Sequence, residues 1–226
     1  MASGMGTRML PLTKTIPKPL LKISGVSMIE TVINGLCKRG VNNIYVVVGY
    51  LGDAFSYLSS KYDNVHIMMN QVYEKVNNIS TIYVARDILR KGACFICETD
   101  LYVSDSELFM KSLNQSGYFG KLVQGLSTDW VFDTNESGII TRVGKVGTDA
   151  YNMVGISYFT SEDAKILADC IEYEYGKRGY EELFWDDVVN RHIDQFKLRV
   201  YPVATNSIEE VDTVDELYSI RERYGN

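Results

Sequence analysis

The sequence lacks the features that mark several classes of protein. No stretch of its 226 residues approaches the run of about eighteen apolar residues that a membrane-spanning helix requires. Basic residues are not in excess, since 23 lysines and arginines face 29 aspartates and glutamates and the net charge is −6. We therefore expect no membrane partner and no nucleic-acid partner, because binding to a phosphate backbone needs a dominant basic surface.

Histidine and cysteine are also scarce. The two histidines, His66 and His192, belong to no recognisable Ser-His-Asp or Cys-His set for covalent catalysis. Among the four cysteines, Cys94 and Cys97 form a C-x-x-C inside a stretch typical of a buried strand, where their odd spacing places the two thiols on opposite faces. We expect neither zinc nor a disulfide here, and we predict a reducing, cytoplasmic location.

What is present is the pattern of an α/β protein. Hydrophobic residues make up 46% of the chain and charged residues 23%, enough for a normal core. Apolar residues recur at helical spacing from Met28 to Leu36, and Ile44 to Val48 is a continuous apolar run, as in a buried parallel strand. Further helices are expected at about 55–62 and 78–89, and strands at 65–69 and 93–97. This alternation predicts a mixed, mostly parallel sheet flanked by helices.

The rhythm changes from about residue 118. Short strands are expected at 119–125, 129–134, 139–143, 153–159 and 198–203, and helices at about 161–176, 182–193 and 213–224. No repeat, low-complexity tract or linker separates this part from the rest. We therefore predict a single domain, 1–226, whose halves 1–117 and 118–226 share one sheet.

The first twenty residues carry the strongest signal. They contain the segments Ser3-Gly4-Met5-Gly6-Thr7-Arg8 and Pro17-Lys18-Pro19. Glycines allow backbone N–H groups to approach a ligand closely, and consecutive N–H groups in such a loop form a concavity that binds anions. A plain turn followed by a proline-rich surface loop would not explain the arginine and lysine beside it. The segment therefore predicts a site for a polyphosphate.

This two-part pattern resembles the signature of the nucleotidyltransferases that make sugar nucleotides and CDP-alcohols, in which P-K-P follows a G-x-G-T-R loop after about ten residues. The resemblance implies the Rossmann-like fold of the nucleotide-diphospho-sugar transferases. It also implies a strand before the loop. Only Met1 and Ala2 precede the loop here, so we expect that the first strand is missing and that the sequence begins about five to eight residues late.

The resemblance also implies roles for individual residues. Ser3, Gly4, Gly6 and Thr7 would bind the nucleotide, and Arg8 and Lys18 would be catalytic. Asp100 follows an apolar strand, where α/β proteins place ligand sites, and with Asp212 it matches the positions that hold Mg²⁺ in the family. Asp100 could instead lie in a surface turn, and Asp212 could cap the final helix.

The nucleobase is expected to be cytosine. Residues 70–78 are similar to the same stretch of the bacterial CTP:phosphocholine cytidylyltransferases. Asn77, Asn78 and Ser80 offer amide and hydroxyl groups that can pair with a base edge. The alternative is that these side chains only cap a helix and line a polar loop.

The second half is expected to bind the acceptor. Trp130 and Trp185, the two tryptophans, both stand beside acidic residues, and an aromatic face with carboxylates nearby attracts a methylated ammonium. Both stretches resemble those of the phosphocholine enzymes, although Phe159 stands where we expect a tryptophan in that branch. Both tryptophans could instead simply fill the core. The expected acceptor contacts are Trp130, Asp133, Lys145, Tyr158, Trp185 and Asp186.

These features predict a Mg²⁺-dependent cytidylyltransferase. CMP would pass from CTP to phosphocholine, with release of pyrophosphate. The attacking phosphate oxygen is already anionic, so the reaction needs no general base. The alternative acceptor is 2-aminoethylphosphonate, whose primary ammonium prefers carboxylates to a closed aromatic box; phosphoethanolamine also remains open. A sugar-1-phosphate nucleotidyltransferase and a catalytically dead nucleotide sensor are the remaining alternatives.

Overall fold

The structure is a computed structural model that describes residues 1–225. These residues form two compact units. The first unit contains residues 1–74, 98–111 and 206–225, and the second contains residues 75–97 and 112–205. The prediction of a single domain with halves 1–117 and 118–226 stays a prediction.

The first unit combines short strands with three α-helices. Its helices are α1 (Met28–Arg39), α2 (Tyr57–Lys61) and α6 (Val214–Tyr224). Its strands are β1 (Lys22–Ile23), β2 (Val26–Ser27), β3 (Ile44–Val48), β4 (Val65–Met69), β6 (Leu101–Val103) and β10 (Ile208–Glu210). The apolar run predicted as a buried parallel strand is β3, which pairs in parallel with β4. Ala2 adds a parallel bridge to Val48 at the end of β3.

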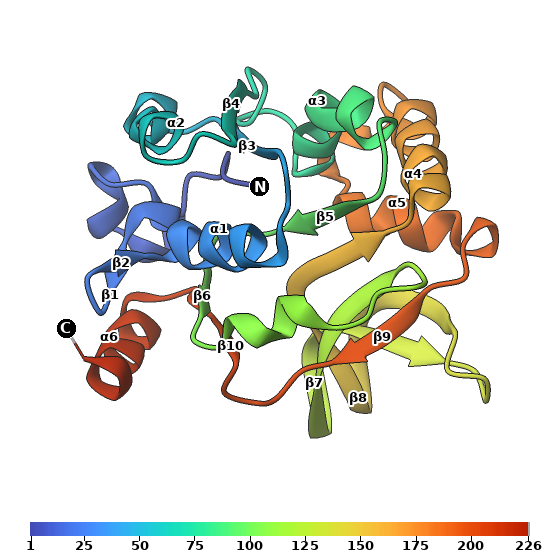
Figure 1. Cartoon of the computed structure of the whole chain (residues 1–226). Coiled ribbons are helices and arrows are strands. Elements are labelled where there is room, and N and C mark those ends of the chain that lie inside the picture. The colour runs from blue at the N-terminus through green and yellow to red at the C-terminus, as the bar shows by residue number, and fades with distance from the viewer. Residues whose placement is uncertain (226) are drawn as a thin grey trace. The chain divides into compact units, whose positions relative to one another are not determined.

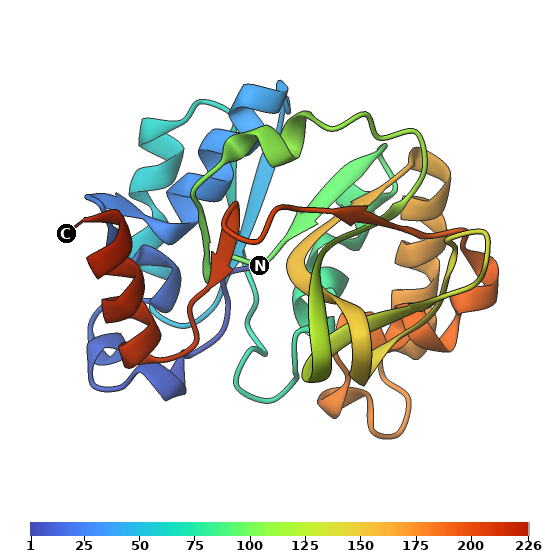
Figure 2. The same cartoon turned by 90° about the horizontal axis from the view of Figure 1, so that it is seen from below.

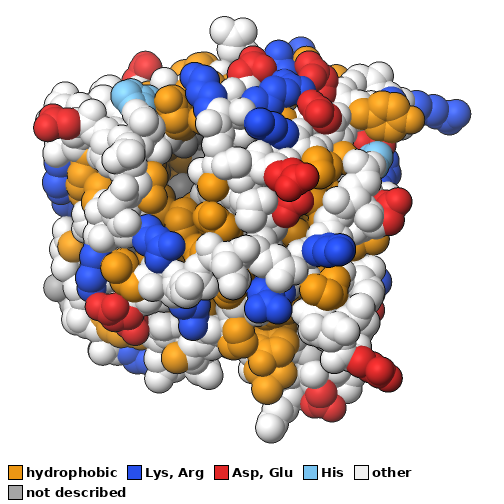
Figure 3. All heavy atoms as spheres, turned by 45° about the vertical axis from the view of Figure 1, so that its right-hand side comes forward, with side chains coloured by type: hydrophobic (Ala, Val, Ile, Leu, Met, Phe, Trp, Pro, Cys, Tyr) orange, Lys and Arg blue, Asp and Glu red, His pale blue; other side chains and the backbone are white. Residues whose placement is uncertain are grey.

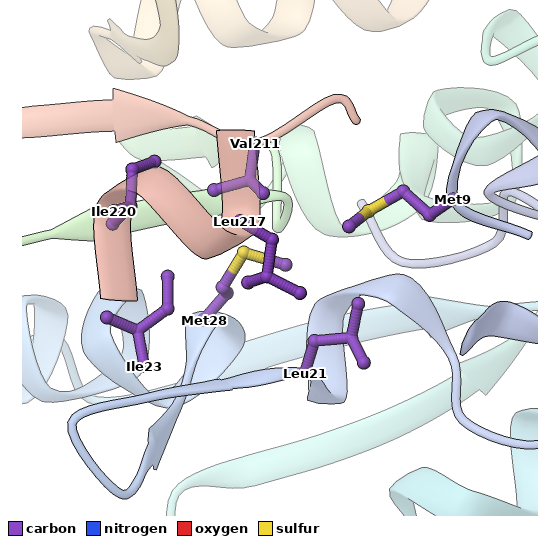
Figure 4. Close-up of a cluster of buried hydrophobic side chains, with 7 residues drawn as sticks. All are labelled: Met9, Leu21, Ile23, Met28, Val211, Leu217 and Ile220. Atoms are coloured by element: carbon purple, nitrogen blue, oxygen red, sulfur yellow. The ribbon is translucent and has the colours of Figure 1, made fainter. Parts of the chain in front are cut away.

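Two segments that are distant in sequence meet in the first unit. β6 and β10 pair antiparallel, with Leu101 opposite Glu210, and Figure 2 shows the two strands side by side. Helix α6 follows β10 and buries Leu217 and Ile220 in a cluster with residues from the start of the chain. Figure 4 shows this cluster, which consists of Met9, Leu21, Ile23, Met28, Val211, Leu217 and Ile220. Packing of this cluster therefore fixes the loop that begins the chain against the segment that ends it.

The second unit is a four-stranded sheet with helices packed on it. The strands run in the order β5 (Cys94–Cys97), β8 (Ile140–Phe159), β7 (Gly117–Thr134) and β9 (Arg199–Pro202). β5 and β7 are antiparallel to β8, whereas β9 is parallel to β7. The helices are α3 (Ile79–Leu89), α4 (Ser161–Glu174) and α5 (Trp185–Arg191). Figure 1 shows them gathered on one side of this sheet, where α4 and α5 pack against β8.

The mixed α/β class is confirmed, with a larger share of antiparallel pairing than the sequence predicts. The short strands expected between residues 119 and 159 are parts of two long strands, β7 and β8. The register of this pair shifts at several points, for example between Val123 and Leu126, so that polar and glycine residues lie inside continuous strands. β-Bulges of this kind interrupt the alternation of side chains without ending the strand.

Two expectations based on composition can be compared with the structure. No helix within residues 1–225 is both long and apolar enough to cross a membrane. On the face that Figure 3 shows, basic and acidic side chains are interspersed. Cys94 is half-buried in β5, and the surrounding protein raises the pKa of its thiol to about 12.

Candidate active site

The glycine-rich loop is shaped by Gly6. This residue has φ 61°, and a Cβ atom built on it would lie 3.0 Å from the Cβ of Lys18. Its carbonyl oxygen accepts a hydrogen bond from the Thr13 hydroxyl at 2.9 Å. A Cβ on Gly4, in contrast, would meet nothing within 4 Å. Gly6 is therefore needed for the left-handed turn and for the close approach of Lys18, while Gly4 leaves the exposed side of the loop open.

The other loop residues predicted to bind nucleotide differ in exposure. Ser3 is buried, and its carbonyl oxygen accepts a hydrogen bond from the backbone N–H of Tyr50 at 3.2 Å. Thr7 is exposed at the start of the first 3₁₀ turn, Thr7–Met9. Ser3 thus anchors the loop beside β3, and Thr7 lies on its solvent side.

Lys18 forms the centre of the site. Its side chain is almost wholly buried, and its ammonium donates to Asp100 Oδ2 and to Asp212 Oδ1, both at 2.8 Å. Burial alone would lower the pKa of this lysine, but the two carboxylates outweigh burial and raise it. Lys18 is therefore held as a cation between two carboxylates that are 112 residues apart in the sequence.

Arg8 contacts the same carboxylate from the solvent side. Its Nη2 donates to Asp212 Oδ1 at 2.7 Å, and its side chain is 67% exposed. The structure thus brings together Arg8, Lys18, Asp100 and Asp212, the four residues expected to be catalytic or metal-binding. Their functional roles remain predictions, but their proximity is a property of the fold.

The position of Asp212 argues against a capping role. The N-cap of α6 is Thr213, whose hydroxyl accepts from the backbone N–H of Glu216 at 3.2 Å. The carboxylate of Asp212 instead faces Lys18 and Arg8. Asp100 is tied to the same segment, because its carbonyl oxygen accepts from the N–H of Val211 at 3.0 Å. The pairing of β6 with β10 therefore places both aspartates at one point.

A third carboxylate, Glu210, joins this point and was not among the predicted ligands. One oxygen from each of Asp100, Glu210 and Asp212 lies within 4.8 Å of the others. The pKa of Glu210 is raised to about 8. The larger cause is removal of its carboxylate from water by the surrounding protein, and the next is repulsion by neighbouring carboxylates, of which Asp100 contributes most. Glu210 is exposed to solvent as a residue, but its carboxylate lies beside those of Asp100 and Asp212, which repel its negative charge. Residues 210 and 212 are two apart, the spacing that places side chains on one side of an extended chain, but a strand of three residues is too short for this spacing to identify Glu210 from the sequence.

The three carboxylates suit a divalent cation. Mg²⁺ prefers oxygen ligands at about 2.0–2.1 Å, so ligand oxygens on opposite sides of the ion are about 4.2 Å apart. Ligand oxygens on adjacent corners of the octahedron are closer, about 2.9 Å. The three side chains, whose oxygens lie within 4.8 Å of one another, would therefore converge further around a bound ion. The acidic cluster therefore fits the group that the sequence resemblance implies.

The residues predicted to recognise the base belong to the second unit. Asn77 donates from its side chain to the carbonyl oxygen of Glu182 at 3.2 Å, and Asn78 accepts from the backbone N–H of Trp185 at 2.8 Å. The Ser80 hydroxyl is buried and donates to the carbonyl oxygen of Asn77 at 2.8 Å. The side chains of Asn77 and Asn78 thus link the start of α3 to the start of α5. A role in base recognition stays a prediction.

Trp185 and Asp186 lie in the core of the second unit. Trp185 is 3% exposed, stacks on Tyr118 at 5.8 Å between ring centroids, and packs edge-on against Phe159. Asp186 is 2% exposed and accepts a hydrogen bond from the Tyr118 hydroxyl at 3.1 Å. For Trp185, this arrangement matches the alternative given above, in which the tryptophan fills the core.

The remaining predicted acceptor residues lie around β7 and β8. Trp130 is half-buried and packs edge-on against Phe184, and the ammonium of Lys145 lies 5.6 Å from the centroid of the Trp130 ring. Asp133 forms an ion pair with Arg142. Tyr158 is half-buried with its ring centroid 5.3 Å from that of Phe95. Trp130 and Lys145 are therefore neighbours, whereas the charge of Asp133 is engaged by an arginine.

The buried Asp186 yields a prediction about stability. Burial, with a smaller contribution from Asp187, raises its pKa to about 8. Between about pH 4 and pH 8 the folded chain therefore keeps a proton that the unfolded chain has lost, so stability falls as pH rises, by up to about 1.4 kcal/mol per pH unit. We expect Asp186→Asn to flatten this part of the curve. Tyr118→Phe removes a hydrogen bond to the ionised form, so it should extend the fall in stability to higher pH, because the slope at lower pH already equals that of one proton. Urea unfolding at pH 5, 6.5 and 8 measures both slopes; identical slopes in wild type and Asp186→Asn would contradict the assignment.

Comparison with known proteins identifies relatives along the whole chain. Residues 1–120 match the model of the nucleotidyl transferase family. A 2-aminoethylphosphonate cytidylyltransferase from Lancefieldella rimae is 51% identical over 99% of this chain and 91% of the relative. A choline-phosphate cytidylyltransferase from Streptococcus pneumoniae is 28% identical over 98% of this chain and 95% of the relative.

Solved structures give the same relationship. The structure of the CTP:phosphocholine cytidylyltransferase from Streptococcus pneumoniae matches with a TM-score of 0.89 at 28% identity, covering 98% of this chain and 96% of that one. The inositol-1-phosphate CTP transferase from T. maritima matches with a TM-score of 0.71 at 17% identity, covering 99% and 93%, and shows the shared fold alone.

Proposed function

This chain belongs to the nucleotidyl transferase family, and we propose that it transfers CMP from CTP to 2-aminoethylphosphonate with release of pyrophosphate. Cytidylyl transfer is common to its whole-chain relatives. The observation that carries the choice of acceptor is the identity of 51% to a 2-aminoethylphosphonate enzyme, against 28% to a phosphocholine enzyme. The order of the two acceptors expected from the sequence alone is thereby reversed.

The aromatic residues of the second unit support this choice. A quaternary ammonium needs open aromatic faces, because it has no N–H to donate. Trp185 and Phe159 are buried in the core, and the face of Trp130 lies close to the cation of Lys145. A primary ammonium needs carboxylate acceptors instead, and the exposed Asp129 beside Trp130 is one.

The chemistry follows from the residues around Lys18. An anionic oxygen of the acceptor attacks the α-phosphorus of CTP in line, and pyrophosphate leaves. Catalysis of this kind rests on positioning and on stabilisation of charge. Lys18 would neutralise charge at the α-phosphate, while Arg8 and the N–H groups around Gly4 and Gly6 would hold the outer phosphates. Mg²⁺, held by Asp100, Asp212 and Glu210, would supply further neutralisation of the reacting oxygens when bound.

The test is a comparison of acceptors at saturating CTP and Mg²⁺, with pyrophosphate release as the measurement. We expect kcat/KM for 2-aminoethylphosphonate to exceed that for phosphocholine by at least about a hundredfold, the scale on which a site built for hydrogen-bond donors rejects an analogue without them. Phosphoethanolamine, which keeps the primary ammonium, should be discriminated against less strongly than phosphocholine. Equal or higher rates with phosphocholine would overturn the acceptor. No pyrophosphate with any acceptor would favour a nucleotide sensor instead of an enzyme.

Phosphocholine is the second candidate. The observation in its favour is the match to the phosphocholine enzyme over almost the whole chain, with a TM-score of 0.89. A competition assay with equal concentrations of both acceptors separates the two, because the ratio of the two CDP products then equals the ratio of the kcat/KM values of the acceptors.

A further inference from the structure

Residues 142–147, an irregular stretch of β8 in the second unit where the register with β7 shifts, are held by one guanidinium. Arg142 donates from Nε and Nη2 to the two carboxylate oxygens of Asp133, at 2.5 and 3.0 Å. The same guanidinium donates to the carbonyl oxygens of Lys145 and Val146, at 3.2 and 3.0 Å. A bidentate pair of this kind fixes the plane of the guanidinium, and the two carbonyl contacts fix the backbone of this stretch of β8 relative to that plane.

The backbone of this stretch of β8 is strained at Val146, whose carbonyl oxygen accepts from Arg142. Val146 has φ 68°, in the left-handed region that β-branched residues rarely adopt. Such a conformation persists only where the surroundings impose it. Gly144 leaves the space that the arginine uses, because a Cβ on this residue would lie 2.5 Å from Arg142 Nη1.

Lys145 lies between Gly144 and Val146. It lies opposite Trp130 in the β7–β8 register, and its ammonium is 5.6 Å from the centroid of Trp130 and 5.3 Å from that of Phe184. A cation held on two aromatic faces repels a second cation there and attracts an anion. The anionic end of the acceptor, rather than its ammonium, is the group that this arrangement suits.

We propose that Arg142, braced by Asp133, is a positioning residue that aims Lys145 at the phosphonate or phosphate group of the acceptor. The inference rests on the proposed function, since it needs an acceptor with such a group. It also gives Asp133 a different role from the direct acceptor contact that the sequence suggests.

The test is a double-mutant cycle with Arg142→Ala and Lys145→Met, measuring KM for the acceptor and for CTP. We expect Arg142→Ala to raise the acceptor KM about tenfold, within the range of coupled neighbours, and to change the CTP KM less than twofold. The double variant should be no worse than Lys145→Met alone, because Arg142 acts only through Lys145. Additive effects, or equal changes in both KM values, would overturn the proposal.

A second variant tests the contact between Arg142 and residues 144–146 without removing the charge of the arginine. Gly144→Ala places a methyl group 2.5 Å from Arg142 Nη1, too close for the two to coexist, so it should displace the guanidinium and raise the acceptor KM in the wild-type background. In the Arg142→Ala background the same change should have no further effect. An equal effect in both backgrounds would mean that Gly144→Ala acts on the backbone, and would count against the proposal.

Arg90→Ala is the matched control. Arg90 has similar exposure and bridges Asp169 and Glu172 between α3 and α4, so its loss should leave both KM values unchanged. Thermal unfolding of all variants separates loss of folding from a change in the orientation of the Lys145 side chain. If wild-type protein turns over no acceptor, the proposed function fails before any variant is made; if it turns over one and the cycle is additive, only the role of Arg142 fails.

Discussion

Replacing Lys18 with methionine should lower kcat/KM by about a thousandfold, the scale on which enzymes lose activity when a preorganised charge aimed at the transition state is removed. Lys18 is the buried cation of the site, fixed by two carboxylates at 2.8 Å. Methionine keeps the length of the stem and removes the ammonium. The two aspartates then face each other without their shared cation, so the site loses charge and geometry together.

Lys18→Arg should not rescue the enzyme. The Cβ of Lys18 lies 3.0 Å from where a Cβ of Gly6 would be, and a planar guanidinium cannot occupy the compact position of an ammonium between two carboxylates. Lys14→Met is the matched control, because Lys14 is an exposed lysine of the same loop. Steady-state rates with CTP and the preferred acceptor measure all three variants. A Lys18→Met enzyme that keeps a tenth of wild-type activity would rule out the central role.

The sequence predicts the first unit better than the second. The G-x-G-T-R and P-K-P segments locate Lys18 because the spacing itself is the signal, and the partner aspartates follow from the family pattern. Glu210 escapes because β10 has three residues, too few for alternation to stand out from an acidic stretch. Hydrogen bonding to β6, a contact across more than a hundred residues, is what turns that stretch into a ligand set.

The acceptor residues show a different limit. Tryptophan beside aspartate looks the same in sequence at Trp130 and at Trp185, yet the first ring is half-buried beside a lysine and the second is packed in the core. Burial depends on which strands and helices cover the ring, and single-sequence patterns do not contain that information. The ion pair between Asp133 and Arg142 is hidden for the same reason, since it follows from the pairing register of β7 with β8.

The acidic cluster leads to the second large expected effect, which is loss of metal-dependent activity in Asp212→Asn. Asp212 Oδ1 accepts from both Lys18 and Arg8 and belongs to the proposed ligand set. An amide keeps the shape and removes the charge, so it weakens the metal site and both ion pairs. We expect kcat/KM to fall by about a hundredfold to a thousandfold, as for loss of a group that stabilises charge in the transition state.

Glu210→Gln separates the metal from the ion pairs. Glu210 shares the carboxylate cluster, and among the residues that the structure describes neither Lys18 nor Arg8 has an ion pair with it. Its loss should raise the Mg²⁺ concentration needed for half-maximal rate about tenfold and leave the rate at saturating Mg²⁺ near that of wild type, as for weakening one ligand of a metal site. Asp215→Asn, at an exposed position in the first turn of α6, is the control and should change neither quantity.

Titration with Mg²⁺ after removal of metal by EDTA shows whether these carboxylates bind the metal or only hold Lys18 and Arg8. If Asp212→Asn and Glu210→Gln both shift the metal requirement, and only the former also lowers the saturated rate, Asp212 has two functions: it binds metal and it orients Lys18. If neither shifts the requirement, the three carboxylates serve only to hold Lys18 and Arg8, and Mg²⁺ must reach the reaction on the triphosphate alone. Calorimetric binding of Mg²⁺ in the presence of CTP gives the same distinction without turnover.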